Sequence, residues 1–242
     1  MMKKIQIAII LSLMMLIQGC GSHKRYSIEE IKEQAMLNDK EAQYRLGVYH
    51  EHKENHEEAL KWYESSASLG CLVAQNELGN IYKEARLGLE QDYHKAVEYY
   101  QQASDGEYFD AINNLAYMNG QGLGVKKSRP KAMELYELAA SKGSIRAMYN
   151  LGISYMYGDD ELEKDYIKAY MWLDLGRYYT LTSKDMTLKW TIRARFDELD
   201  KELTYLEKKE AKKLGSQWIK ELKEDIKFKI SLQSNYCSHT YT

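Results

Sequence analysis

The chain has 242 residues, a formal net charge of -2 and a single proline. A chain of this length suits one domain or one repeat array, and its near-neutral net charge shows that it is not a polycation, so no nucleic acid partner is expected. The single proline, 21 tyrosines and few β-branched runs favour an all-α protein.

Residues 1–19 are predicted to be a signal peptide. Lys3 and Lys4 give a positive start, and the apolar run from Ile5 to Ile17 is too short for a comfortable membrane span. The segment closes as Ile17-Gln18-Gly19-Cys20, which resembles the lipobox of bacterial lipoproteins. A cleaved signal followed by an incidental cysteine is the alternative.

The lipobox resemblance implies that Cys20 becomes the lipidated first residue of the mature protein. Two or three acyl chains would supply the several anchors that stable membrane attachment needs. Gly21, and not aspartate, follows the cysteine. In Gram-negative lipoproteins this pattern implies transfer to the outer membrane, and we expect the protein to face the periplasm there.

Residues 20–38 are predicted to be a tether followed by an N-terminal capping helix. Ser27 is a good N-cap residue, and Glu30 three positions later completes a capping box. The helix is expected to run from Ile28 to about Leu37 and to cover the start of the array.

Residues 39–180 contain a pattern that recurs four times. The sequence Ala-x3-Leu-Gly opens at Ala42, Ala74 and Ala147, and at Ala111 with alanine in place of the glycine, so the starts are 32, 37 and 36 residues apart. A second alanine recurs at Ala59, Ala96, Ala132 and Ala169, and a later glycine at Gly70, Gly106 and Gly143. A period in the mid-thirties predicts stacked helical hairpins, because one hairpin cannot bury its apolar face alone.

These residues resemble the Sel1-like repeat family, relatives of the tetratricopeptide repeat. The third unit matches well, with Gly122, Gly124 and Gly143, whereas the second carries Ala85 and Leu87 where the loop glycines are usual. The resemblance implies an α/α superhelical solenoid whose members mostly mediate protein–protein contacts.

Residues 181–230 are predicted to be a C-terminal helical cap. Ser183 can cap a helix from Lys184 to about Leu203, and the capping box Thr204 to Glu207 opens a second helix that carries Trp218. Trp218 is expected to be buried against the tail or the last repeat, because the end of a solenoid must be covered. Residues 231–242 are polar and predicted to be a flexible tail.

With Cys20 lipidated, Cys71 and Cys237 remain. The periplasm would let them form a disulfide, but Cys237 lies in the predicted flexible tail. The sequence leaves this pairing open.

The loop of the first repeat groups potential metal ligands, because His50, His52 and His56 stand among carboxylates. Imidazole and carboxylate are zinc ligands. However, His50 is expected to end one helix and His56 to start the next, which favours a solvated loop. No metal and no cofactor are predicted.

Enzymatic function is disfavoured. The glycines at Gly120, Gly122 and Gly124 have no preceding strand and no following Gly-Lys-Ser, so they indicate a turn and not a phosphate loop. Ser128 to Lys131 matches Ser-x2-Lys, but the companion motifs of penicillin-recognising enzymes are absent from the sequence, and Ser128 fits a helix cap. We therefore expect no catalytic residues.

The candidate binding residues come from the first helix of each repeat, which lines the inner face in a superhelix of this kind. The candidates occupy two positions of each repeat, which we call slots. The slot two residues after the opening alanine holds Tyr44, Asn76, Asn113 and Tyr149, and the next slot holds Arg45, Glu77, Asn114 and Asn150. Tyr44, Tyr93, Tyr117, Tyr149 and Tyr157 are the tyrosines outside the repeat pattern. Aromatic and amide side chains are common in recognition surfaces, but the face could also be simply solvated.

The sequence therefore predicts a non-enzymatic, periplasm-facing lipoprotein whose repeat array binds a protein partner. The alternative within binding is an immunity protein that neutralises a toxin delivered between bacteria, for example by type VI secretion. An envelope enzyme is the disfavoured alternative of another class. Binding through the outer loops instead of the inner face also stays open.

Overall fold

The computed structural model describes residues 27–181 and 185–229, with side chains through residue 222. In this part of the chain all regular elements are helices: α2 (Ile28–Met36), α3 (Lys40–His52), α4 (His56–Ser68), α5 (Leu72–Glu84), α6 (Tyr93–Asp105), α7 (Phe109–Gln121), α8 (Arg129–Ser141), α9 (Ile145–Tyr157), α10 (Tyr166–Tyr179), α11 (Met186–Glu202) and α12 (Tyr205–Lys229). The predicted lipobox at Cys20 and Cys237 lie outside the described residues.

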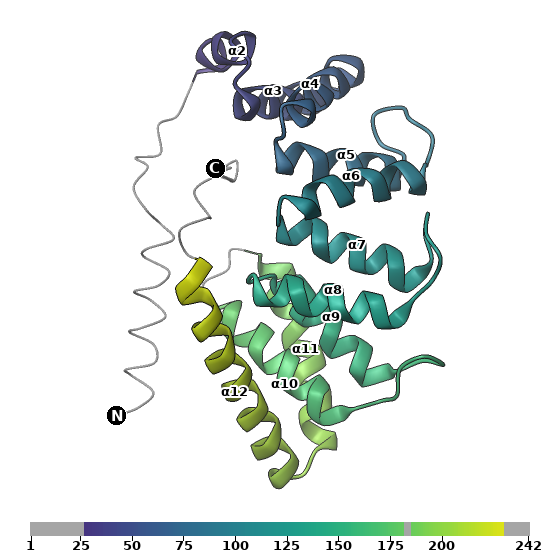
Figure 1. Cartoon of the computed structure of the whole chain (residues 1–242), viewed down its shortest axis with the longest axis vertical. Coiled ribbons are helices and arrows are strands. Elements are labelled where there is room, and N and C mark those ends of the chain that lie inside the picture. The colour runs from purple at the N-terminus through teal and green to yellow at the C-terminus, as the bar shows by residue number, and fades with distance from the viewer. Residues whose placement is uncertain (1–26, 182–184, 230–242) are drawn as a thin grey trace.

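The helices pair into four consecutive hairpins, and each hairpin stacks on the next (Figure 1). We call α3, α5, α7 and α9 the first helices and α4, α6, α8 and α10 the second helices. Each second helix packs against its own first helix and against the first helix that follows. This arrangement confirms the predicted all-α solenoid.

Most helices begin at a short polar side chain that accepts a hydrogen bond from the backbone. The predicted capping box of α2 is confirmed, with Ser27 and Glu30 satisfying each other's backbone N–H groups at 3.2 and 2.8 Å. The predicted start of the next-to-last helix is wrong. α11 begins at Met186, because Asp185 is the N-cap and accepts from the Leu188 N–H at 2.9 Å; Ser183 lies outside the described residues.

The Leu-Gly pair of the repeat is a packing device. The leucines at Leu46, Leu78, Leu115 and Leu151 are at most 3% exposed. The adjacent glycine lets a large side chain of the second helix approach the first helix closely, and in repeats one and two this side chain is a tyrosine. A Cβ atom on Gly79 would lie 2.5 Å from the ring of Tyr100, which is fully buried.

The loop of the second hairpin keeps the turn conformation of the third hairpin without its glycines. Gly122 and Gly124 have φ values of 72° and 66°, and the equivalent Ala85 and Leu87 have 56° and 54°. A left-handed backbone costs a residue with a Cβ roughly 1 to 2 kcal/mol. The loop around Arg86 is therefore locally strained.

Gly106 does not serve as a turn residue. Glu107, with φ of 65°, takes the left-handed position that Gly70 and Gly143 occupy in their repeats. A Cβ atom on Gly106 would instead lie 2.3 Å from Leu72. At Gly106 the absence of a Cβ atom leaves room for the Leu72 side chain, so this glycine contributes to packing and not to the turn.

The predicted C-terminal cap is present. α12 packs on α10, and the Trp218 ring stands edge-on to Trp172 with 5.0 Å between the ring centroids. Trp218 is half-buried, while Ala211 on the same helix is fully buried. The helices described in residues 27–181 and 185–229 contain no apolar stretch of the length that a membrane span requires.

Candidate partner-binding surface

The first helices form the inner side of the array. Neighbouring first helices are joined by direct hydrogen bonds, from the Asn114 amide to Asn76 and from the Asn150 amide to Asn113, both at 2.9 Å. The helices α7 and α9 also come within 8 Å of each other between Cα atoms. Because consecutive first helices approach so closely, the array curves toward them.

A continuous polar ladder occupies this face in repeats one to three. We define the ladder as Glu51, Asn76, Glu77, Asn80, Arg86 and Asn114. Arg86 donates to Glu77 at 2.7 Å and to Glu51, and so connects two repeats. The buried Tyr63 and Tyr100 donate to Glu51 and Asn80 at 2.7 and 2.8 Å. The ladder thus uses its hydrogen-bonding groups internally.

The electrostatics of the ladder hold Arg86 in its charged form. Burial disfavours the guanidinium charge, but hydrogen bonds and Coulomb attraction from Glu51 and Glu77 outweigh it, so the pKa of Arg86 is raised. Burial, with added repulsion from Glu84 and Glu77, raises the pKa of Tyr100. Tyr100 therefore keeps its proton and remains a donor to Asn80.

The structure places most of the predicted binding residues in contacts within the array. Tyr44, Asn76 and Asn113 are 9%, 8% and 6% exposed. The Tyr44 ring lies 5.7 Å from that of Tyr63, and Arg45 pairs with Glu41. The remaining members of the two slots, Glu77, Asn114, Tyr149 and Asn150, are half-buried. Their role in binding stays a prediction.

A second, more exposed part of the inner face lies in repeats three and four. Tyr117 of α7 and Tyr157 of α9 are 44% and 48% exposed. Tyr149 lies two helical turns before Tyr157 on the same side of α9. We call Tyr117, Tyr149, Tyr157 and Arg195 of α11 the tyrosine surface.

Arg195 lies beside Tyr149 and Tyr157 of this surface. Hydrogen bonding to Glu198, the nearby Tyr157 and a hydrogen bond with Tyr149 raise the pKa of Arg195. Its guanidinium therefore stays charged beside two tyrosines. The sequence had shown Tyr117 and Tyr157 only as tyrosines outside the pattern. Residues four positions apart lie on the same side of a helix. Tyr117 is four residues after the candidate Asn113, and Tyr157 is eight residues after the candidate Tyr149, so this spacing is the signal that could have identified both tyrosines.

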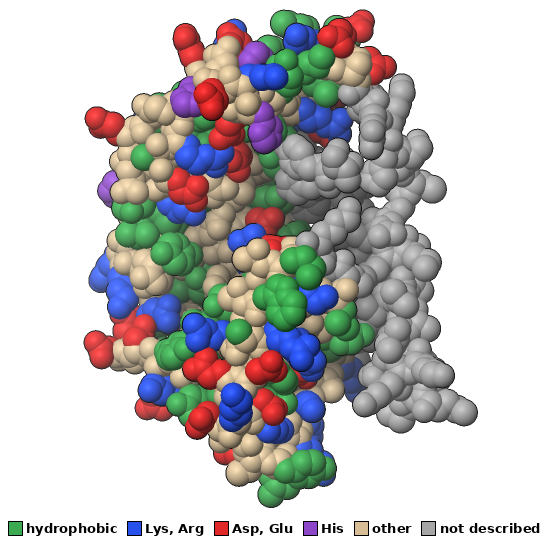
Figure 2. Space-filling view, turned by 180° about the vertical axis from the view of Figure 1, so that it is seen from behind, with side chains coloured by type: hydrophobic (Ala, Val, Ile, Leu, Met, Phe, Trp, Pro, Cys, Tyr) green, Lys and Arg blue, Asp and Glu red, His purple; other side chains and the backbone are tan. Residues whose placement is uncertain are grey.

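The histidines of the first repeat do not converge. His50 and His52 belong to the end of α3 and His56 starts α4, so α3 extends two residues further than predicted. In Figure 2 the histidine side chains are scattered over the upper end of the molecule. Among the residues that the structure describes, no three His, Cys, Asp or Glu side chains are grouped to hold a metal.

An open pocket of about 610 Å³ lies where α10, α11 and α12 meet. Its carboxylate Asp200 accepts a hydrogen bond from Tyr170 at 3.0 Å and pairs with Lys208 at 3.0 Å. The hydrogen bond from Lys208, with help from Tyr170, lowers the pKa of Asp200 against the opposing effect of burial. Asp200 thus joins the cap to the array and is structurally engaged.

A curved stack of helical hairpins with an exposed aromatic inner face defines a repeat scaffold of the kind that binds other proteins. The Sel1 repeat model matches residues 40–71, 72–108, 109–144 and 145–176, which is more than half of the chain. The chain therefore belongs to the Sel1 repeat family, whose members generally mediate protein–protein interactions and are typically non-catalytic.

Known proteins show the same architecture. A protective antigen of uropathogenic Escherichia coli with the same repeat fold is 30% identical, with a TM-score of 0.68 over 94% of this chain and 48% of its own. A Sel1 repeat protein from Oxalobacter formigenes is 24% identical, with a TM-score of 0.57 over 73% and 78% of the two chains.

Among curated proteins, a component of an ERAD-associated E3 ubiquitin-protein ligase from Arabidopsis thaliana, HRD3B, is 32% identical over 103 residues. The match covers 42% of this chain and 16% of the plant protein. The chain thus spans about half of the bacterial antigen and a small part of the plant protein.

Proposed function

We propose that this protein is a non-enzymatic scaffold that binds a protein partner through the tyrosine surface. The observation that supports the proposal is the contrast within the inner face. The polar ladder uses its own hydrogen-bonding groups, whereas Tyr117 and Tyr157 leave almost half of their surface exposed. Tyrosine and arginine are enriched at binding hot spots, because they combine a large apolar contact area with polar groups.

Part of the surface is restrained before binding. Tyr149 is half-buried, and Arg195 beside it pairs with Glu198 at 2.8 Å, so a partner would meet two side chains of restricted motion. Preorganised side chains lose less conformational entropy on binding, which favours affinity. Tyr44 is a poor test residue, because its burial makes alanine at this position a change to the core.

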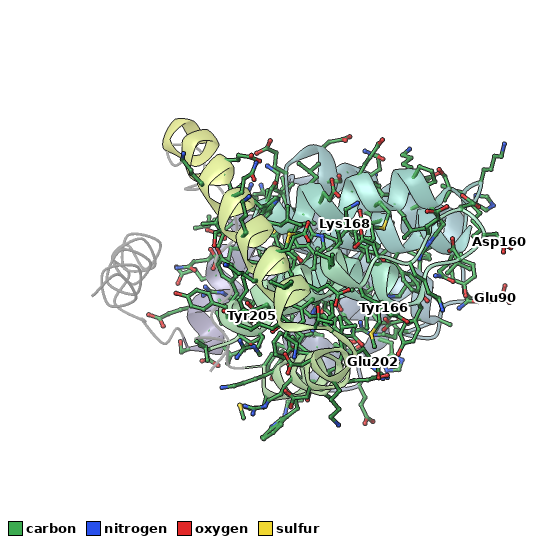
Figure 3. All side chains as sticks on the ribbon, turned by 90° about the horizontal axis from the view of Figure 1, so that it is seen from below. Glu90, Asp160, Tyr166, Lys168, Glu202 and Tyr205 are labelled. Carbon is green, nitrogen blue, oxygen red and sulfur yellow. The ribbon has the colours of Figure 1, made fainter. Side chains whose placement is uncertain are left out.

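Partner capture is expected to fall when the tyrosine surface is truncated. Tyr117→Ala and Tyr157→Ala should each weaken binding by about 1 to 2 kcal/mol, and the double variant by more. The partner is captured from solubilised envelope by affinity purification, identified by mass spectrometry and then titrated against the purified variants. Unchanged affinity of the double variant would exclude this surface and favour the outer loops, where Glu90 and Asp160 project from one edge of the molecule (Figure 3).

Leu138→Ala is the matched control. Leu138 lies on the second helix α8 and is 44% exposed, the same fraction as Tyr117. Its truncation removes a similar share of exposed apolar surface from the opposite side of the hairpin, so it should leave capture unchanged. The identity of the partner then separates the general scaffold from the alternative immunity protein, since only the latter should capture a toxin.

We further propose that the scaffold is a lipoprotein anchored through Cys20. The lipobox resemblance at Ile17 to Cys20 supports this proposal. Cys20→Ser should abolish acylation, leave the precursor unprocessed and remove the acyl-dependent membrane attachment. Metabolic labelling with a fatty acid, together with membrane fractionation, measures all three. A serine variant that is still acylated and processed would refute lipidation at this cysteine.

A further inference from the structure

Among the described residues, α11 has no second helix lying along it, unlike the first helices α3, α5, α7 and α9. Counted from the N-cap residue, Ile192 of α11 stands where Leu46, Leu78, Leu115 and Leu151 stand, and it is fully buried like them. α11 is therefore the first helix of a fifth unit. However, α12 packs mainly on α10 and touches α11 near its end, where Lys208 pairs with Asp200, so it does not lie along α11 as a second helix would.

The face of α11 that would receive its own second helix is exposed. In α9 this face carries Gly152, whose added Cβ atom would lie 2.7 Å from Leu173 of α10. The equivalent residue in α11 is Arg193, which is exposed. Because an arginine cannot allow the close approach that the glycine permits, a hairpin helix of the repeat type is excluded at this face.

The same face is more apolar than a solenoid end should be. Trp190 is 65% exposed and Met186, one turn earlier, is 52% exposed, with Leu181 before the helix at 64%. Terminal units of solenoids normally present a polar outer face. An exposed tryptophan beside two exposed apolar side chains indicates an interaction surface.

The charges on this face are complementary to themselves. Arg193 and Asp197 lie one turn apart and form an exposed pair at 3.4 Å, and Lys201 follows one turn later. Two copies of α11 placed antiparallel about a two-fold axis would bring each Arg193 opposite the partner's Asp197. In this register Trp190 lies opposite position 200 of the partner, and the exposed Lys201 is the next residue along, close enough for its ammonium to approach the ring in a cation–π contact. A parallel pairing would oppose like charges.

From this register we infer that two copies of the protein associate through antiparallel α11 helices, with Trp190, Arg193 and Asp197 at the centre. In Figure 1 α11 lies in the lower part of the array, far from α2 and from repeats one and two. A single pair of helices buries less than a standard interface, so the dimer should be weak, with a dissociation constant on the order of 10 to 100 µM.

Sedimentation equilibrium of the full chain tests the inference over a concentration range that brackets this constant. The mass should rise from monomer to dimer, and Trp190→Ala should weaken association at least about tenfold, as expected for a central tryptophan. Arg193→Asp and Asp197→Arg should each weaken it, because each opposes like charges across the axis. The variant that carries both substitutions should regain association, because residue 193 of one copy and residue 197 of the other again have opposite charges.

Three results would overturn the inference: a monomer at all concentrations, association that Trp190→Ala leaves intact, or a double swap no better than either single change. Circular dichroism checks that the exposed substitutions leave the fold intact. The test is independent of the proposed function. Tyr117→Ala should leave the dimer unchanged, and Trp190→Ala should leave capture of the heterologous partner unchanged.

Discussion

Replacing Tyr100 with alanine is expected to destabilise the array by about 3 to 5 kcal/mol, the range measured for large aromatic side chains removed from cores. Tyr100 is fully buried, and its ring fills the space that Gly79 leaves open on the first helix. Its hydroxyl also donates to Asn80 of the polar ladder at 2.8 Å. Urea unfolding followed by circular dichroism measures the change in the free energy of unfolding.

Tyr100→Phe separates the ring from the hydroxyl. Phenylalanine keeps the ring against Gly79 and removes only the hydrogen bond to Asn80, so its cost should be about 0.5 to 1.5 kcal/mol. If the alanine and phenylalanine variants lost the same stability, ring packing would not be the main contribution. If the free energy of unfolding of the alanine variant depended differently on urea concentration, the repeats would no longer unfold together.

The second large effect is expected at the C-terminal cap. Trp218→Ala should cost about 2 to 4 kcal/mol, toward the lower end of the range for tryptophan because the side chain is half-buried. The substitution removes the edge-on contact with Trp172, which is 3% exposed in the last repeat. This contact helps to hold α12 on α10. In the variant, the amide hydrogens of α12 should therefore exchange faster than the amide hydrogens of α5 and α7.

Trp190→Ala is the matched control for the cap. It removes the same side chain from the same C-terminal region, but Trp190 is 65% exposed. Its effect should stay within about 0.5 kcal/mol, as is usual for surface positions, provided that the protein is dilute enough to be monomeric. Equal melting temperatures for the two tryptophan variants would mean that α12 does not stabilise the last repeat.

The internal repeat by itself determined the architecture. Ala-x3-Leu-Gly and the recurring second-helix positions describe contacts made mainly within one hairpin, such as Gly79 against Tyr100. Contacts of this kind are encoded locally and repeat with the sequence, so the solenoid could be predicted. The capping box at Ser27 is equally local, because both of its hydrogen bonds span three residues.

The tertiary structure alone decided which inner-face residues are accessible. The exposure of Asn76 and Asn113 depends on the next repeat, whose Asn114 and Asn150 lie 38 and 37 residues later in the chain. The first helices could be aligned from the sequence, but the distance between successive helices could not. The short distance between successive first helices buries Asn76 and Asn113. Tyr117, one helical turn after Asn113, remains exposed.

The loops and the end of the array show the same limit. Ala85 and Leu87 adopt left-handed conformations that their side chains disfavour, and Arg86 between them pairs with Glu51 of the preceding repeat and Glu77 of its own. The backbone preferences of alanine and leucine alone would not predict these left-handed conformations. In the same way, the period of the sequence does not show that α12 packs on α10, which leaves Trp190 on an uncovered face of α11. Repetition fixes what each unit buries within itself, whereas the surface left for partners depends on contacts between units.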